Sequence, residues 1–153
     1  MSILILAFLI GIIAGLRALM APAIASWGAG LGWFSLAGTP LSFMSHAITR
    51  WIFTIAEVGE IINDKLPKTP SRKVPPQFIA RVVMGGLAGA TLGAAHDALL
   101  GGLIAGAIGA VVGTLGGASV RGALSKAFGK DLPAALLEDA VALLGAIFIV
   151  SRV

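Results

Sequence analysis

Charged residues interrupt segments that are otherwise apolar enough to lie in lipid, and six of them suit a polar pathway. They are Arg17, Glu57, Glu60, Asp64, Glu138 and Asp139. A charge near the middle of a bilayer costs at least about 2.5–3.5 kcal/mol on insertion scales, and an arginine cannot lose its proton to avoid that cost. Arg17 must therefore pair with a carboxylate or line water. Glu57 is the first candidate partner, because its predicted depth in the membrane is nearest to that of Arg17. Glu138 or Asp139 is the next candidate.

Two interpretations of these charges stay open. Intramembrane charges often mark pathways, so Arg17 and the carboxylates suit a substrate or ion site. A buried ion pair that only fixes the register of the helices is the alternative. Glu57, Glu60 and Asp64 lie along one side of the same predicted helix. Burial and neighbouring carboxylates favour proton uptake, so this row suits proton coupling or cation passage, unless the lower half of the helix is simply hydrated.

The elements that position these charges are predicted to be membrane helices. The chain of 153 residues is 58% hydrophobic and 12% charged, about half the charged fraction of a typical soluble domain. A crossing helix needs about 20 apolar residues. We therefore predict an all-α, polytopic membrane protein with a single transmembrane domain over residues 1–153. The five predicted crossings are 3–25, 45–66, 76–95, 99–119 and 132–150.

The stretch between the first two predicted crossings is different. Residues 26–44 are interrupted by Gly, Ser and Pro, so an interfacial or re-entrant segment is expected there. All three tryptophans, Trp27, Trp33 and Trp51, fall at this end, which matches an aromatic belt at a membrane interface. Within the first crossing, Pro22 is expected to kink or locally open the helix.

Basic residues gather in the stretches 65–81 and 121–130. The positive-inside rule places both in the cytoplasm, so five crossings put the N-terminus inside and the C-terminus outside. Their side chains suit contacts with lipid phosphates or anionic headgroups, although a topology signal, which needs no ligand, is the favoured explanation. The candidates are Lys65, Lys68, Arg72, Lys73, Arg81 and Arg121. Because the basic residues flank membrane segments, we predict no nucleic-acid partner.

Glycines recur through the third and fourth predicted crossings. Gly85, Gly89 and Gly93 are spaced by four residues, and a longer series follows from Gly102 to Gly117. Small residues at this spacing let helix backbones approach closely. We therefore predict a glycine-zipper packing surface and a homo-oligomer. A pore lined by small residues within that homo-oligomer is the alternative.

Nothing in the chain indicates a catalytic or metal centre. Cysteine is absent, and the two histidines, His46 and His96, fall short of a metal-ligand set. No Gly-x-Gly-x-x-Gly motif lies between a strand and a helix, and no histidine lies near an intramembrane acid. We predict no metal, no cofactor and no catalytic residue. An enzyme acting on a lipid phosphate ranks last among the function classes, because it lacks a nucleophile.

Two parts of the chain echo each other. The run Gly15 to Leu19 resembles the run Ser119 to Ala123, with an arginine at the centre of each. Glu57 precedes Arg72 at nearly the same spacing as Glu138 precedes Arg152. If the first two and the last two crossings form an inverted repeat, a site at their junction is typical of transporters. Chance similarity in an apolar sequence is the alternative.

Three groups of motifs carry a resemblance to a known family. They are Gly15-Leu16-Arg17-Ala18 with Ala21-Pro22, the run from Asp64 to Arg72, and Asp131-Leu132-Pro133 with Glu138-Asp139 and Ser151-Arg152. With these motifs the chain resembles the domain-of-unknown-function 4126 family of bacterial integral membrane proteins. The resemblance implies a multi-pass protein of the bacterial inner membrane and supplies no activity.

These observations predict a small integral membrane transporter or channel. Its polar pathway consists of the six charged residues named first. An anionic substrate suits Arg17, and protons or cations suit the acidic residues. The alternative is a non-transporting scaffold or a subunit that binds anionic lipid, in which the charges only hold the bundle together. Membrane lipids and further copies of the chain are the predicted partners.

Overall fold

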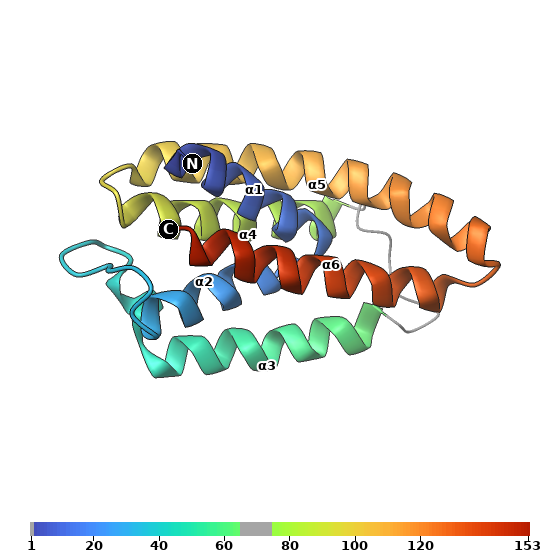
Figure 1. Ribbon diagram of the computed structural model, residues 1–153, viewed down its shortest axis with the longest axis horizontal. Helices are drawn as coiled ribbons and strands as arrows, with labels where there is room; N and C mark the ends of the chain where they lie inside the picture. The colour runs from blue at the N-terminus through green and yellow to red at the C-terminus, as the bar shows by residue number, and fades with distance from the viewer. Residues whose placement is uncertain (1, 65–74) are drawn as a thin grey trace.

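The computed structural model describes residues 2–64 and 75–153, which form a bundle of helices without a strand among them (Figure 1). The elements are α1 (Ile3–Leu16), α2 (Met20–Gly30), the 3₁₀ turn η1 (Ser42–Ser45), α3 (Ala47–Asp64), α4 (Pro75–Ala94), α5 (Leu99–Phe128) and α6 (Asp131–Ser151). Among the described helices, α4, α5 and α6 are long and apolar enough to cross a membrane. The predicted all-α class is confirmed, and these three helices suit a membrane protein.

The first apolar segment is not one crossing helix, so that prediction is wrong. α1 ends at Leu16 and α2 begins at Met20. α1 runs in the same direction as α5, because Leu4 lies against Gly101 and Ile12 lies against Gly113. α2 returns toward the end where α1 began (Figure 1). Pro22 lies in the first turn of α2, where a missing N–H costs no helical hydrogen bond, so it does not cause the break.

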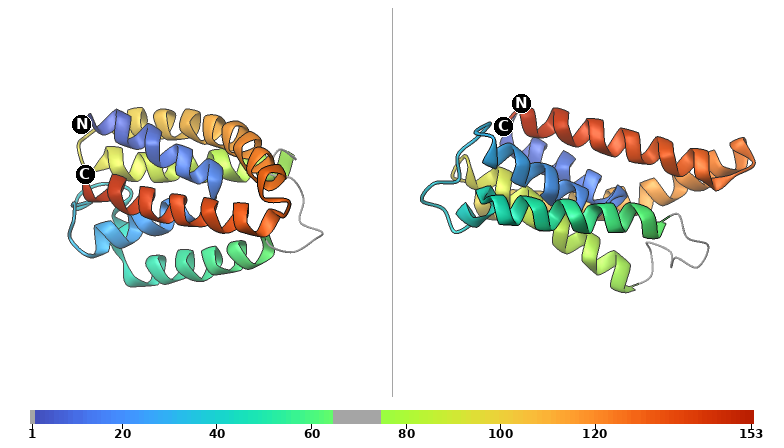
Figure 2. Two further views of the ribbon diagram at one scale, coloured as in Figure 1. Left: turned by 45° about the vertical axis from the view of Figure 1, so that its right-hand side comes forward. Right: turned by 90° about the horizontal axis from the view of Figure 1, so that it is seen from below.

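The reversal changes the arrangement of the whole chain. Both termini lie at the same end of the bundle (Figures 1 and 2), whereas five crossings would put them at opposite ends. The inverted repeat considered for the two ends of the chain is not confirmed by the described helices. An inverted repeat would oppose α1 and α5, but the two helices run in the same direction. In addition, α5 continues unbroken through Arg121, while α1 stops just before Arg17.

α5 is longer than the sequence predicted. The expected end was residue 119, but the helix continues to Phe128 and stops at Gly129, whose left-handed conformation (φ 71°) is a common way to end a helix. The extension is held against α6, because Arg121 forms ion pairs with residues of that helix. α5 and α6 therefore reach beyond the other described helices at the end opposite the termini (Figure 2).

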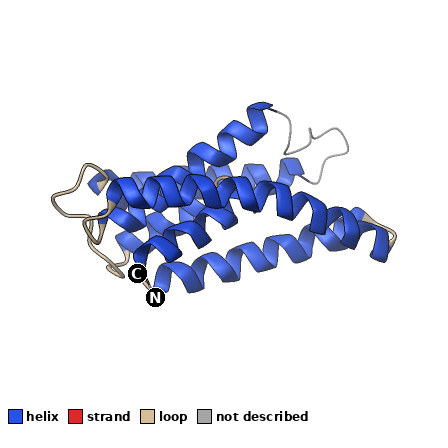
Figure 3. Cartoon of the chain, turned by 90° about the horizontal axis from the view of Figure 1, so that it is seen from above, coloured by secondary structure: helices blue, strands red, loops and turns tan. Residues whose placement is uncertain are grey.

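α1, α4 and α5 form the tightly packed side of the bundle. Gly85 and Gly89 of α4 lie directly against Gly106 and Gly102 of α5, so that a Cβ atom on these glycines would meet the backbone of the facing helix. Gly11 of α1 packs against Gly106 from the other side. This packing leaves α2 and α3 on the opposite side, next to α6. The loop and 3₁₀ turn over residues 31–46 lie at the end of the bundle that carries the termini (Figure 3).

Candidate functional site

The break between α1 and α2 is the centre of the candidate site. Arg17 has an extended backbone (φ −141°, ψ 106°) directly after the last residue of α1, and α2 starts at Met20. The end of a helix leaves up to four backbone N–H or C=O groups without an intrahelical partner. In an apolar interior these groups need partners from elsewhere in the protein. Charged side chains supply several of them here.

Two guanidinium groups bind the carbonyl end of α1. Arg81 of α4 donates from Nη1 to the carbonyl oxygen of Gly15 at 3.1 Å. Arg17 donates from Nη1 to the carbonyl oxygen of Leu16 at 3.3 Å. The C-terminal end of a helix carries partial negative charge, which favours cations. Arg17 is 0% exposed and Arg81 is 5% exposed. Both guanidinium groups therefore interact with partners inside the protein.

A carboxylate binds the opposite end of the break. Glu60 of α3 accepts hydrogen bonds from the backbone N–H groups of Ala18 and Leu19, each at 2.9 Å and each through a different oxygen. Nη2 of Arg81 lies 3.6 Å from Oε1 of the same carboxylate. Leu19 at the N-cap position of α2 has no side chain that can accept a hydrogen bond. Glu60 therefore supplies the cap that the local sequence lacks.

The side chain of Arg17 joins the break to α6. Its Nε donates to Oδ1 of Asp139, with which it also forms an ion pair. Its Nη1 lies 3.4 Å from Oε1 of Glu138. Arg17 therefore pairs with carboxylates as its position demanded. Asp139 provides the direct hydrogen bond, whereas the predicted depth in the membrane had favoured Glu57 as the first partner.

The charged cluster continues toward the end opposite the termini. Nη1 of Arg121 lies 3.6 Å from Oε1 of Glu138, and its Nη2 donates to Oδ2 of Asp131 at 2.8 Å. Ser125 donates to the same aspartate at 2.8 Å. For Arg81 and Arg121, contact with lipid or phosphate stays a prediction, and the structure places both in ion pairs within the bundle. The reason is that the break and α6 bring carboxylates to them.

Glu57 lies one helical turn from Glu60 and differs from it in its partners. The residue is 7% exposed. Within the described part of the chain, neither of its carboxyl oxygens has a hydrogen-bond partner. The charges that act on it are those of Glu60, Arg17 and Asp139. Glu57 is thus a buried acid beside the charged cluster, and the carboxyl group of Glu60 is its interacting neighbour on the same helix.

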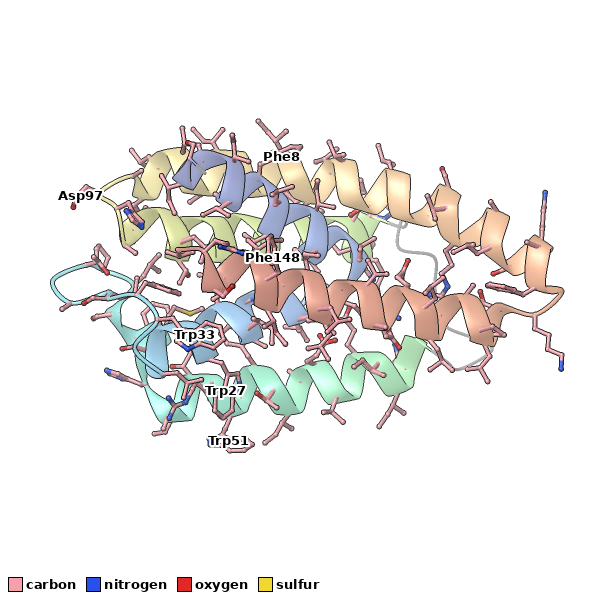
Figure 4. The ribbon with its side chains drawn as sticks, viewed as in Figure 1. Phe8, Trp27, Trp33, Trp51, Asp97 and Phe148 are labelled. Atoms are coloured by element: carbon pink, nitrogen blue, oxygen red, sulfur yellow. The ribbon has the colours of Figure 1, made fainter. Side chains whose placement is uncertain are left out.

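Polar groups continue along α3 toward the end that carries the termini. The indole Nε1 of Trp27 donates to Oγ1 of Thr54 at 2.8 Å. Arg50 lies over the ring of Trp27, 5.0 Å from its centroid, in space that Gly30 leaves because it has no side chain. Trp51 meets Trp27 edge to face (Figure 4). We call the following set the polar column: Arg50, Thr54, Glu57 and Glu60 of α3, with Arg17, Glu138 and Asp139.

A separate hollow of about 380 Å³ opens near the same end. Its lining includes Ser35, Ser42, Ser45 and His46, together with apolar residues such as Phe34. Ser26 of α2 donates to the carbonyl oxygen of Met44 beneath this region. The lining contains neither Glu57 nor any other member of the polar column. Sequence analysis gave no signal for this hollow.

Several predicted site residues lie outside the described residues. The basic residues Lys65, Lys68, Arg72 and Lys73 belong to the stretch 65–74, and the side chain of Asp64 is also not described. Sequence analysis missed the helix break and the roles of Glu60 and Arg81 at its two ends. The one available signal was Arg17 inside an apolar segment, which indicated a buried partner but not a reversal of the chain.

The described residues contain no group of three or more His, Cys, Asp or Glu side chains placed to hold a metal ion. Comparisons of the chain with models of known protein families, with curated proteins and with solved structures found no match.

Proposed function

We propose that the chain is a small membrane transporter or channel and that the polar column is its pathway. The observation that carries this proposal is Glu57, a buried acid with no described hydrogen-bond partner beside a cluster of paired charges. A carboxylate in such a place is costly for stability. Ionisable groups inside membrane helices usually mark the path of an ion or a substrate. A role in moving an ion gives Glu57 a reason to be there.

The extent of the polar column supports the same proposal. Arg50 and Glu60 are ten residues apart on α3, which corresponds to about 15 Å along the helix axis. Arg17 and Asp139 continue the column at the helix break. The hydrocarbon core of a bilayer is about 30 Å thick, so the distance from Arg50 to Glu60 corresponds to about half of it. Small anions suit the arginines of the column, and protons or cations suit its acids. In the sequence, Asp64 extends this row by one further turn.

The proposal includes a membrane topology. α4, α5 and α6 would cross the bilayer. α3, which is less apolar and whose 18 residues correspond to about 27 Å, would lie beside them through the bilayer, while α1 and α2 would enter it and return as a re-entrant hairpin. α1 has 14 residues and α2 has 11, which correspond to about 21 Å and 16 Å, too short to cross. Lys126 and Lys130 are exposed at the end opposite the termini. By the positive-inside rule, both termini then lie outside the cytoplasm, unlike the cytoplasmic N-terminus expected from five crossings.

The resemblance to the domain-of-unknown-function 4126 family stays a prediction, and with it the location in the bacterial inner membrane. Lys126 and Lys130 also suit contacts with anionic headgroups of that membrane. Contact with further copies of the chain is a second proposal about partners. It is supported by the outer face of α3, where Ile48, Ile55 and Ile62 are exposed. Lipid alone would also cover this face.

A second candidate function is a non-transporting scaffold or lipid-binding subunit. One observation favours it: the charged groups of Arg17 and Glu60 each have partners that hold the α1–α2 break in place. Those contacts explain these residues without any transported ion. Glu57 is the residue that this alternative leaves unexplained.

Ion flux in proteoliposomes tests the proposal. Wild-type protein and the Glu57→Gln variant would be reconstituted, and flux of protons, Na⁺, K⁺ and Cl⁻ would be measured under a clamped membrane potential, with protein-free liposomes as the blank. Flux through the wild type and its loss in a variant of equal thermal stability are expected. Wild-type flux equal to that of the blank for every ion would contradict transport and favour the scaffold.

A further inference from the structure

We infer that the ion bound inside the polar column is a proton, and that Glu57 is the group that binds it. This inference rests on the proposed transport function and specifies its ion. It follows from a comparison of the polar groups around the helix break: most already have hydrogen-bond or ion-pair partners, and one does not.

The two ends of the break would otherwise be binding sites for other ions. In transporters with broken helices, carbonyl groups at a helix end coordinate cations, and N–H groups at a helix start bind anionic substrates. Here the carbonyl oxygens of Gly15 and Leu16 receive hydrogen bonds from arginines. The N–H groups of Ala18 and Leu19 donate to Glu60. These contacts compete directly with a metal cation at one end and with a free anion at the other.

Glu57 is the acid that these contacts leave available. It is 7% exposed, and its two oxygens have no hydrogen-bond partner within the described part of the chain. Small metal cations bind through several oxygen ligands at once. No set of three acids or histidines among the described residues is placed to supply them. A proton needs one oxygen atom only.

The chemistry of proton binding fits the surroundings of Glu57. On uptake, an O–H bond forms between a proton from water and one carboxylate oxygen, and on release that bond breaks and the proton returns to water. The protonated group is neutral and has a donor of its own. The charged groups that act on it are Glu60 of its own helix, Arg17 at the break and Asp139 of α6. Arg81 of α4 reaches this set through Glu60.

Proton release is coupled to the helix break through Arg17. A charged Glu57 competes for Arg17 with its present partners on α6, Asp139 and Glu138. Arg17 also donates to the carbonyl end of α1. Movement of Arg17 toward Glu57 would therefore loosen the link between the re-entrant hairpin and α6. A change in the charge of one buried acid thus acts on the position of the α1–α2 turn.

Infrared difference spectroscopy on the protein in lipid detects the bound proton without requiring transport. Spectra would be recorded between acidic and alkaline pH in sodium, potassium and choline salts. We expect a carboxylic-acid C=O band in the wild type that is insensitive to the cation and lost in Glu57→Gln. Asp97→Asn, which removes an exposed acid in the α4–α5 turn, should keep the band and serves as the matched control.

Proton flux in proteoliposomes is measured on the same variants with an internal pH-sensitive dye. At least a tenfold loss in Glu57→Gln is expected, with partial flux in Glu57→Asp and full flux in Asp97→Asn. Absence of the Glu57 band, or its replacement by a response to Na⁺ or to an anion, would overturn the inference while leaving transport open. A Glu57 band without flux of any ion would instead contradict transport and leave Glu57 as a proton-binding group.

Discussion

The two sides of the bundle are held together by different chemistry. On one side, α1, α4 and α5 meet through glycines, and backbone lies against backbone at Gly85–Gly106 and Gly89–Gly102. On the other side, the α1–α2 break meets α3 and α6 through ion pairs and hydrogen bonds of Arg17 and Glu60. The first interface is formed by close backbone contact, with one hydrogen bond from Arg81 to Gly15 at the end of α1, whereas the second depends on charged side chains.

The difference has a consequence for motion. A glycine interface between backbones leaves no space for a helix to shift without loss of contact, because protein interiors are close-packed. Charged side chains can exchange partners when one of them gains or loses a proton. We therefore expect α1, α4 and α5 to act as the rigid part and the α1–α2 turn with α3 and α6 as the adjustable part. The following substitutions test that distinction, beginning with the largest expected effect.

Removal of the central guanidinium should have the largest effect. Arg17→Met leaves Asp139 and Glu138 facing an uncharged side chain, and breaking a buried ion pair in this way costs about 3–5 kcal/mol. Thermal unfolding in detergent should show a strong decrease in Tm. Arg152→Met is the matched control, because Arg152 is exposed at the end of α6 and lies over Phe148. An equal Tm for Arg17→Met and wild type would contradict the role of the ion pairs.

A methyl group in the glycine interface should be nearly as damaging. In Gly106→Ala the new Cβ would meet the backbone carbonyl of Gly85, so one helix must move, at a cost of about 1–3 kcal/mol. Gly116→Ala, on the same helix but with no atom near its Cβ position, should be neutral or slightly stabilising. The comparison requires Tm values and size-exclusion profiles of both variants. Similar losses at both positions would show that the contact with α4 does not decide the effect.

The two glutamates of α3 should separate stability from function. Glu60→Gln keeps one acceptor oxygen but faces two backbone N–H donors, so we expect a loss of about 1–2 kcal/mol. Glu57→Gln removes none of the described hydrogen bonds and should change the free energy of unfolding by less than about 1 kcal/mol. Chemical unfolding of both variants provides the measurement. A larger loss in Glu57→Gln than in Glu60→Gln would mean that Glu57 holds the fold together.

The smallest effect is expected near the end that carries the termini. Trp27→Phe removes the hydrogen bond to Thr54 but keeps an aromatic ring, so it should cost about 1 kcal/mol. Trp33→Phe changes an exposed ring and serves as the control. A double-mutant cycle with Thr54→Val would isolate the hydrogen bond. Additive losses in the cycle would show that the contact contributes nothing beyond the packing of the two side chains.

Part of the candidate site could be predicted from the sequence because burial of a charge demands a partner. Arg17 in an apolar segment indicated a carboxylate nearby, and Asp139 is that partner. The geometry could not be predicted in the same way. Arg81 near a proline-rich basic stretch of the sequence suggested contact with lipid, and nothing in that stretch indicated that Arg81 binds Gly15 and Glu60. These residues are far apart in the sequence. They come into contact only because α1 stops at Leu16 and α3 packs against the break.

Composition and the spacing of apolar residues by themselves determined that the protein is helical and suited to a membrane, because both properties depend on local sequence. The starts and ends of α4 and α6 are also local, and they lie within about one residue of their predicted positions. Tertiary structure alone decided that the first apolar segment turns back at Arg17. A reversal leaves backbone groups without helical partners, and those groups become stable only when Arg81 and Glu60 of other helices reach them.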